Sequence, residues 1–194
     1  MKNKKEKVVI NRLRIISGKY RNHYIDRPSW ETTRPTIEKV REAIFSSIHF
    51  ELENSVVLDL FTGSGAWIIE AVSRGAKYAI GLEKDKEAYK IINNNLNKLK
   101  IDNASVVLTD CYDYLLKNNQ TFDFIFMDAP FKDYELINKC LELINKKSLL
   151  NKNGNVIIET DNRNMIIIPN GMNIVKEKLY SFNKSVLFIS KDVE

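Results

Sequence analysis

Cysteine and histidine are scarce in this chain of 194 residues, which has two of each. Cys111 and Cys140 lie far apart along the sequence, and His23 and His49 are isolated, so neither pair has the spacing of a metal site. We therefore expect no bound metal. We interpret the two cysteines as free thiols in a reducing cytoplasm.

Long hydrophobic runs are also missing. No apolar stretch approaches the length of a membrane span, and the lysine-rich amino terminus lacks the pattern of a cleavable signal. The chain is long enough for one medium-sized domain with a full hydrophobic core. We therefore expect a cytoplasmic, monomeric protein that has no membrane partner.

Charge is distributed unequally along the chain. Residues 1–41 contain twelve Lys and Arg against four Asp and Glu, a balance of +8, whereas the remaining 153 residues have a balance of −3. A basic segment on a mildly acidic body is typical of proteins that bind a polyanion. The alternative is that the first lysines, at positions 2, 4, 5 and 7, only form a solubilising tail.

The amino-terminal segment has the pattern of a β-hairpin. Residues 13–17 and 21–25 flank a Gly18-Lys19 turn. The basic side chains of this hairpin are Arg14, Lys19, Arg21 and Arg27. A helix is expected next, from about residue 37 to 50, because apolar residues recur along one of its faces.

Strands and helices alternate after residue 54. Strands are expected near residues 56–60, 78–82, 104–108, 122–127 and 155–159. Helices are expected at 64–74, 85–99, 110–118 and 133–147. This alternation predicts an α/β fold with a doubly wound, mostly parallel sheet that helices cover on both faces. Two further strands, near 172–179 and 185–189, predict a terminal antiparallel hairpin.

The run from residue 57 to 65 joins an apolar strand to a glycine turn and then to a helix. Gly63 and Gly65 allow the backbone to turn sharply and to approach a ligand, and the following helix points unpaired N–H groups at the same place. A dinucleotide site would need glycine or alanine three residues after Gly65, where this chain has isoleucine. With Asp59 and Phe61 before the glycines, the run resembles motif I of the class I S-adenosylmethionine-dependent methyltransferases. The resemblance implies that these four residues contact the cofactor, and it implies a sheet of five parallel strands plus the antiparallel hairpin.

Two further acidic residues follow predicted strands. Glu83 ends the strand after the glycine turn, where a carboxylate can accept hydrogen bonds from both ribose hydroxyls of the cofactor. This position resembles motif II of the same class, although an exposed carboxylate before the next helix is the alternative. Asp110 follows the strand near 104–108. It either contacts the cofactor adenine, as the family resemblance implies, or caps the next helix.

The apolar run 124–127 leads into Asp128-Ala129-Pro130-Phe131. This run resembles motif IV of the amino-group methyltransferases, in which an acceptor, two prolines and an aromatic residue follow one another. An exocyclic amine of a nucleobase is a poor nucleophile, and an acceptor at Asp128 can orient its N–H groups so that the nitrogen lone pair faces the methyl group. Phe131 can stack on a base turned out of its helix, and Pro130 stiffens the turn. Ala129 replaces the first proline of the pattern.

A narrower resemblance covers almost the whole chain. Residues 14–21, 33–36 and 40–45, together with the motifs above, resemble the RsmD-type 16S ribosomal RNA guanine-N2 methyltransferases. We expect a basic tail and hairpin that dock RNA, residues 1–36, followed by a methyltransferase domain, residues 37–194. The residues predicted to bind RNA are Arg14, Lys19, Arg21, Arg34 and Arg41.

The resemblance implies methyl transfer from S-adenosylmethionine, without a metal, to the N2 amine of one guanine in 16S rRNA. It also implies that the substrate is an assembled or assembling 30S subunit. The residues themselves do not identify the base, because the turn at 128–131 suits adenine-N6 and guanine-N2 chemistry equally. Two alternatives remain: an adenine-N6 methyltransferase acting on RNA or DNA, and a catalytically inactive RNA-binding assembly factor, marked by Ala129.

Overall fold

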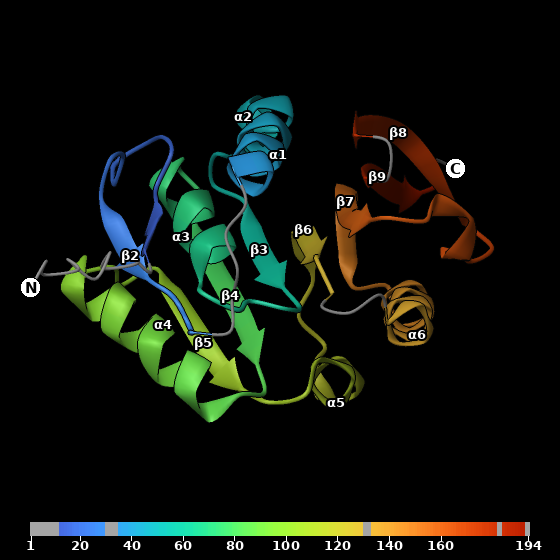
Figure 1. Cartoon of the computed structure of the whole chain (residues 1–194). Helices are drawn as coiled ribbons and strands as arrows, with labels where there is room; N and C mark the ends of the chain where they lie inside the picture. Colours follow the sequence, from blue (N-terminus) through green and yellow to red (C-terminus); the bar gives the residue numbers. More distant parts are fainter. Residues whose placement is uncertain (1–11, 30–34, 130–132, 182–183, 193–194) are drawn as a thin grey trace, which may run out of the picture.

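A seven-stranded sheet forms the centre of the protein, a computed structural model of which describes residues 12–29, 35–129, 133–181 and 184–192 (Figure 1). The strands of this sheet are β3 (Val56–Asp59), β4 (Tyr78–Glu83), β5 (Ala104–Leu108), β6 (Phe122–Met127), β7 (Leu150–Thr160), β8 (Met172–Ser181) and β9 (Lys184–Lys191). Their spatial order is β5-β4-β3-β6-β7-β9-β8. The first five strands in this order are parallel, and β9 runs antiparallel between β7 and β8. The predicted α/β fold with a terminal antiparallel hairpin is confirmed.

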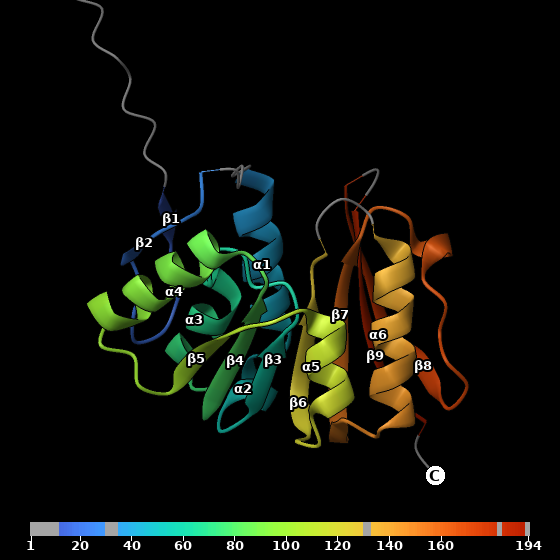
Figure 2. The same cartoon turned by 90° about the horizontal axis from the view of Figure 1, so that it is seen from below.

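Helices cover both faces of this sheet. They are α1 (Pro35–Ser47), α2 (His49–Leu52), α3 (Ala66–Ser73), α4 (Lys86–Lys98), α5 (Cys111–Lys117) and α6 (Tyr134–Lys146), and a 3₁₀ turn, η2 (Arg163–Met165), follows β7. Side chains of α1, α3 and α4 share one hydrophobic cluster, whereas α5 and α6 contribute to a second (Figure 2). Val57 belongs to the first cluster and Leu58 to the second, because successive strand side chains point to opposite faces.

Aspartate caps explain where two of the helices begin. Asp85 accepts a hydrogen bond from the amide of Ala88 at 2.8 Å and so starts α4. Asp133 accepts one from the amide of Leu136 at 3.1 Å and starts α6. These side chains satisfy amide groups that the first helical turn leaves unpaired.

The strand β7 is longer than the predicted strand 155–159. Leu150 pairs with Phe122, and the regular ladder resumes where Asn155 pairs with Phe124. The register shifts between these two pairs, where polar residues and a glycine, 151–154, interrupt the apolar pattern. The sequence pattern therefore predicts only the second half of the strand.

The amino-terminal hairpin consists of β1 (Arg12–Arg14) and β2 (Tyr24–Asp26), which are shorter than predicted and are joined by a longer loop. Gly18 in this loop has φ of +81°, and a Cβ there would lie 1.7 Å from the carbonyl oxygen of Ser73 at the end of α3. The amide of Lys19 donates to the same carbonyl oxygen at 2.7 Å. Glycine is therefore required because the loop lies directly against the helix.

A buried carboxylate attaches this loop to the rest of the protein. Glu70 of α3 is fully buried and accepts hydrogen bonds from the amides of Ile16 and Ser17 at 2.9 and 3.0 Å. The Arg74 guanidinium lies 2.7 Å from the same carboxylate. Asn95 of α4 makes two further bonds to the backbone of Asp26. The hairpin thus has a fixed position on α3 and α4, while the domain division at residue 36 stays a prediction.

None of the helices in the described parts of the chain combines the length and the apolar character needed to cross a membrane.

Candidate active site

Four acidic side chains lie at the carboxyl edge of the sheet. Asp59 ends β3, Glu83 ends β4, Asp128 follows β6, and Glu159 is the next-to-last residue of β7. These strands are parallel neighbours in the order β4-β3-β6-β7, so their carboxyl ends meet at one edge. Ligands of open α/β sheets bind outside this edge. The structure therefore brings together three predicted site residues and adds Glu159.

The turn between β3 and α3 requires glycine at two positions. Gly63 has φ of 57° and Gly65 has φ of 82°, which residues with a Cβ rarely adopt. A Cβ on Gly65 would also lie 3.0 Å from Cγ2 of Ile92. Because α3 begins directly after Gly65, its unpaired amide groups face the carboxyl edge of the sheet.

Glu83 connects the end of β4 to the glycine turn. Its Oε2 accepts a hydrogen bond from the amide of Gly63 at 3.0 Å, and its Oε1 accepts one from the amide of Asp85 at 2.8 Å. A carboxylate can accept about four hydrogen bonds, so each oxygen keeps capacity for a ligand hydroxyl. The predicted ribose contact is compatible with this geometry and stays a prediction.

Asp59 is fully buried and only partly satisfied. Its Oδ1 accepts a hydrogen bond from the amide of Phe61 at 3.2 Å, whereas Oδ2 has no partner among the described residues. Burial raises the pKa of Asp59 from 3.8 to about 8, and the negative charges of Asp128 and Glu83 add to the increase. A cationic group bound nearby would offset the cost of ionising this carboxyl, so the site suits the positively charged S-adenosylmethionine.

Asp110 caps α5, as one of the two interpretations predicted. Its Oδ1 accepts hydrogen bonds from the amides of Tyr112 and Asp113 at 2.8 and 3.3 Å. A contact between Asp110 and the cofactor adenine stays a prediction. Phe61 is half-buried and packs against the hydrophobic cluster under α5 and α6.

Asp128, at the end of β6, lies between the glycine turn that follows β3 and the end of β7. Burial raises the pKa of its carboxyl, and the positive charge of Lys184 acts in the opposite direction. The neighbouring Ala129 packs against the hydrophobic cluster. Pro130 and Phe131, the other predicted catalytic residues, lie outside the described residues.

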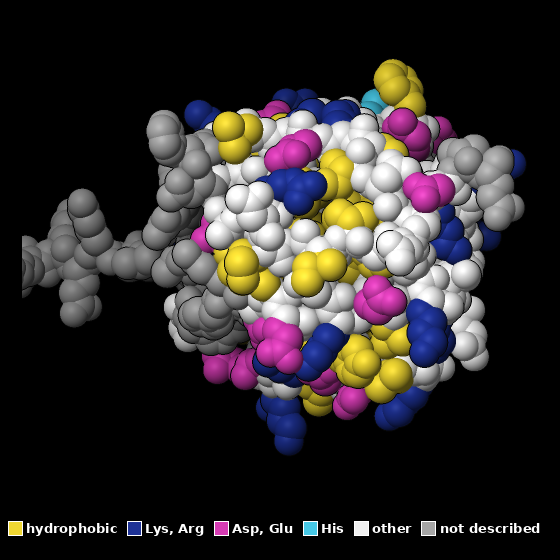
Figure 3. Space-filling view, turned by 90° about the vertical axis from the view of Figure 1, so that its right-hand side faces the viewer, with side chains coloured by type: hydrophobic (Ala, Val, Ile, Leu, Met, Phe, Trp, Pro, Cys, Tyr) yellow, Lys and Arg dark blue, Asp and Glu magenta, His cyan; other side chains and the backbone are white. Residues whose placement is uncertain are grey.

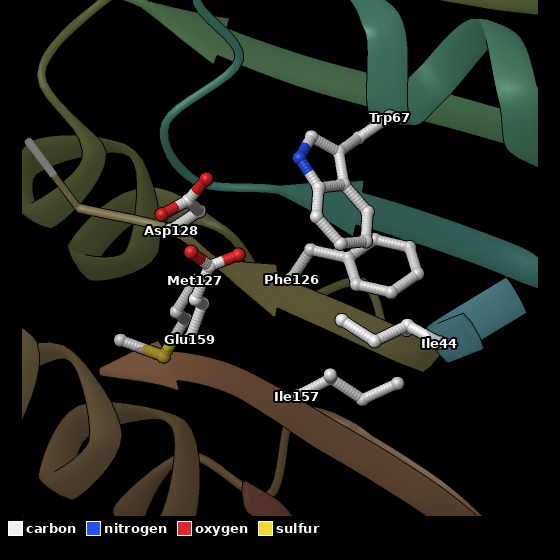
Figure 4. A pocket seen from close by; sticks show the side chains of 7 residues that line it. All are labelled: Ile44, Trp67, Phe126, Met127, Asp128, Ile157 and Glu159. Carbon is white, nitrogen blue, oxygen red and sulfur yellow. The ribbon is translucent and has the colours of Figure 1, made fainter. Parts of the chain in front are cut away.

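An apolar hollow lies beside the carboxylates of Asp128 and Glu159 (Figure 4). The other residues that line it are Ile44, Trp67, Phe126, Met127 and Ile157. The rings of Trp67 and Phe126 lie against each other, with centroids 4.8 Å apart. The lining thus combines an apolar floor with two acceptors at its rim.

Of the residues that line this hollow, the sequence predicted only Asp128 as a site residue; Glu159 and Trp67 are two that it did not. Glu159 ends the predicted strand 155–159, as Glu83 ends its own strand, so the same signal could have identified it. Trp67 reaches the hollow from α3, and its sequence neighbours give no sign of this position.

The predicted RNA-binding residues have different environments. Arg14, Lys19 and Arg21 are exposed on the hairpin. Arg41 was predicted to contact RNA, but only 2% of it is exposed, and its guanidinium donates to the carbonyl oxygen of Arg14 at 2.9 Å. The side chain connects α1 to β1 in this structure, so a contact of Arg41 with RNA would require it to leave this position. Arg27 is also buried, and Arg34 lies outside the described residues.

The two cysteines are free, as predicted, but they are not far apart in space. Cys111 of α5 and Cys140 of α6 are buried, and their sulfur atoms lie 3.8 Å apart. Among the described residues, no group of His, Cys, Asp and Glu has the arrangement of a metal site.

Solved structures define the class to which this fold belongs. A putative methyltransferase from Escherichia coli superimposes with a TM-score of 0.86 at 27% identity, covering 94% of this chain and 99% of that one. A putative methylase from Haemophilus influenzae gives a TM-score of 0.78 at 29% identity, with the same coverage. A more distant putative methyltransferase, complexed with SAH, shares the fold at 17% identity and a TM-score of 0.56, over 75% of this chain and 48% of that one. The fold is that of a class I methyltransferase.

Sequence relatives define the family. The family model described as "Conserved hypothetical protein 95" matches residues 13–189. A Buchnera aphidicola (subsp. Baizongia pistaciae) protein named ribosomal RNA small subunit methyltransferase D is 38% identical over 181 residues, which are 92% of each chain. The protein of the same name from Escherichia coli K12 is 29% identical over 86% of this chain and 84% of its own. This chain belongs to that family, the RsmD-type methyltransferases.

Proposed function

We propose that this protein transfers a methyl group from S-adenosylmethionine to the N2 amine of a guanine in 16S rRNA. One observation carries the proposal. In a chain of this family, the glycine turn after β3 and the Asp128 acceptor after β6 lie on adjacent parallel strands. A cofactor bound at the turn and a base held at Asp128 would therefore be neighbours.

The first part of the proposal concerns the cofactor. Glu83 would accept the ribose hydroxyls, and the unpartnered Oδ2 of Asp59 would face the positive charge of the methionine portion. Gly63 and Gly65 would allow close approach, while Phe61 and Asp110 complete the predicted set. When bound, the cofactor supplies an electrophilic methyl carbon, whose bond to sulfur breaks as the bond to N2 forms.

The second part concerns the base. Asp128 would accept an N–H of the exocyclic amine and so direct the nitrogen lone pair toward the methyl carbon. The transfer needs no strong base at this position, because N2 can release its proton to water after the methyl group has arrived. Phe131 would stack on the flipped base, and Pro130 would hold the turn.

The third part concerns RNA. The exposed Arg14, Lys19 and Arg21 would contact phosphates, with Arg34 as a predicted further contact. We propose that the substrate is an assembled or assembling 30S particle, that the protein acts as a cytoplasmic monomer and that no metal takes part.

Two measurements test the function. Isothermal titration with S-adenosylmethionine should show binding, and incubation with undermethylated 30S particles and tritiated cofactor should label 16S rRNA in the presence of EDTA. Mass spectrometry of the labelled RNA should give N2-methylguanine. N6-methyladenine would instead support the adenine alternative, and RNA binding without transfer would support an inactive assembly factor.

A further inference from the structure

Glu159 lies beside Asp128 because of the strand register. Met127 of β6 pairs with Ile158 of β7, so the next residues along the two parallel strands are Asp128 and Glu159. Both line the same hollow, and their carboxylates lie near each other beside its apolar side chains (Figure 4). The fold therefore places a second acceptor next to the one that we assign to the amine.

The Glu159 carboxylate lies at the end of β7, on the side of β6 that faces away from the proposed cofactor position. The residues that we propose to bind the cofactor lie at the ends of β3 and β4, and β6 separates these strands from β7 in the sheet. A base whose amine reaches Asp128 can therefore extend over β7 without crossing the glycine turn. The apolar floor at this point comes from Ile157 and Trp67.

Glu159 has a cationic partner in the structure. Only 6% of its side chain is exposed, yet the ammonium group of Lys184, at the start of β9, forms an ion pair with its carboxylate. Such an ion pair offsets part of the cost of burying a carboxylate. Because Lys184 occupies Oε1, Oε2 is the oxygen that has capacity for another donor.

Guanine and adenine differ at the ring position next to the amine. The Watson–Crick edge of guanine carries two adjacent donors, N1–H and the N2 amine, whereas N1 of adenine is an acceptor. Two neighbouring carboxylates match the donor pair of guanine and repel the lone pair of adenine N1.

We propose that Glu159 accepts the N1–H of the target guanine while Asp128 holds its N2 amine, which makes Glu159 the residue that selects guanine. This inference rests on the proposed function, since it assumes that the base lies at Asp128. A site that hydrogen-bonds one edge of a substrate discriminates strongly against an analogue that leaves its polar groups unpaired.

A purine analogue tests this assignment directly. 2,6-Diaminopurine keeps the N2 amine of guanine but has an acceptor at N1, as adenine does. The target guanine is first identified by mass spectrometry of RNA that the wild-type protein has methylated. Splinted ligation then places 2,6-diaminopurine at that nucleotide in 16S rRNA, and the particle is reconstituted.

The wild-type protein should methylate guanine at least about a hundredfold faster than 2,6-diaminopurine at that position. Glu159→Gln should reduce this preference to less than about tenfold, because an amide can either accept from guanine N1–H or donate to the N1 acceptor. The affinity for S-adenosylmethionine should not change in titration. The preference compares two substrates of one variant, so a smaller amount of folded protein does not affect it.

Two further variants separate selection from simple packing. Glu177→Gln removes an exposed carboxylate of β8, which lies 3.8 Å from Arg163, and should leave rate and preference unchanged. Lys184→Gln removes the cation that offsets the cost of burying the Glu159 carboxylate, so the preference for guanine should fall toward that of Glu159→Gln.

The outcomes distinguish this inference from the function on which it rests. A wild-type protein that methylates no guanine in 30S particles would overturn both. Normal wild-type activity with an unchanged preference in Glu159→Gln would overturn only the role of Glu159. So would a folded, cofactor-binding Glu159→Gln variant that is inert on guanine, because its amide oxygen can still accept N1–H.

Discussion

The two halves of the carboxyl edge are built differently. On β3 and β4, the glycine turn is held by backbone amides that donate to Glu83 and Asp59, so its geometry depends on nearby segments of chain. On β6 and β7, Glu159 is held by Lys184, a side chain from the terminal antiparallel hairpin. The contacts of the first half come from β3, β4 and the turn between β3 and α3, whereas those of the second also involve β9. Local backbone contacts are expected where an enzyme binds a cofactor that many enzymes share. Contacts from a more distant part of the chain are expected where it selects its own substrate.

The largest effect is expected on the β6 side, at Asp128. Asp128→Ala should lower turnover at least about a hundredfold, because the amine would no longer be oriented toward the methyl carbon. Single-turnover methylation of 30S particles measures this decrease. Affinity for S-adenosylmethionine should stay near the wild-type value, and full activity in this variant would remove Asp128 from the mechanism.

On the β3 side, Asp59 should show opposite effects on stability and on binding. Its pKa rises from 3.8 to about 8 on folding, so the native protein holds a proton that the unfolded chain releases between these pH values. The free energy of unfolding should therefore fall as pH rises through this window, by an amount on the order of one kcal/mol per pKa unit. Asp59→Asn should remove this decrease and make the ligand-free protein more stable above pH 8 than the wild type.

The same substitution should weaken cofactor binding, because the neutral amide does not attract a cation. In the wild type, binding should release a proton below pH 8, since the cation favours the ionised carboxylate. Titration in buffers of different ionisation enthalpy measures this release. Cofactor affinity that is independent of both pH and Asp59 would place the cation elsewhere.

A smaller effect is expected at the hairpin, which lies outside both halves of the edge. Replacing Arg14, Lys19 and Arg21 together with alanine should weaken binding to 30S particles. The slope of its salt dependence should fall by about one unit for each phosphate that these side chains neutralise in the wild type. A matched control removes three exposed lysines of α6 and β7: Lys139, Lys146 and Lys152.

This control should keep the wild-type salt slope. The surface beside β8 mixes Lys and Arg with Asp and Glu (Figure 3). Equal slopes in both triple variants would show that the hairpin does not dock RNA. Neither variant should change cofactor affinity.

The smallest change is expected for Ala129→Pro, which restores the usual motif beside Asp128. Ala129 packs against the hydrophobic cluster. If the alanine is a local variation, activity should be preserved or raised, because proline is the usual residue of the motif at this position. An inert wild-type protein together with an active Ala129→Pro variant would show that this chain has no catalytic activity of its own.

The local geometry at the ends of β3 and β4 follows from the sequence because its signals are local. The turn from Asp59 to Gly65, the strand-end Glu83 and the apolar strands each lie within a short segment. Their residue types follow directly from backbone geometry and from strand periodicity.

The arrangement of residues at the ends of β6 and β7 could not be predicted in the same way. Ile44, Trp67 and Glu159 meet only after the sheet has assembled, and the register of β6 with β7 decides that Glu159 lies beside Asp128. The burial of Arg41 was missed for a similar reason. Its partner, the carbonyl oxygen of Arg14, becomes a neighbour only when the hairpin packs on the domain.

One measurement tests the central claim most directly: mass spectrometry of 16S rRNA from undermethylated 30S particles after incubation with this protein and S-adenosylmethionine. The proposed mechanism predicts N2-methylguanine at a single nucleotide, absent from a parallel incubation with Asp128→Ala. Methylation of adenine, or no methylation by a wild-type protein that binds both the cofactor and the particles, would contradict it.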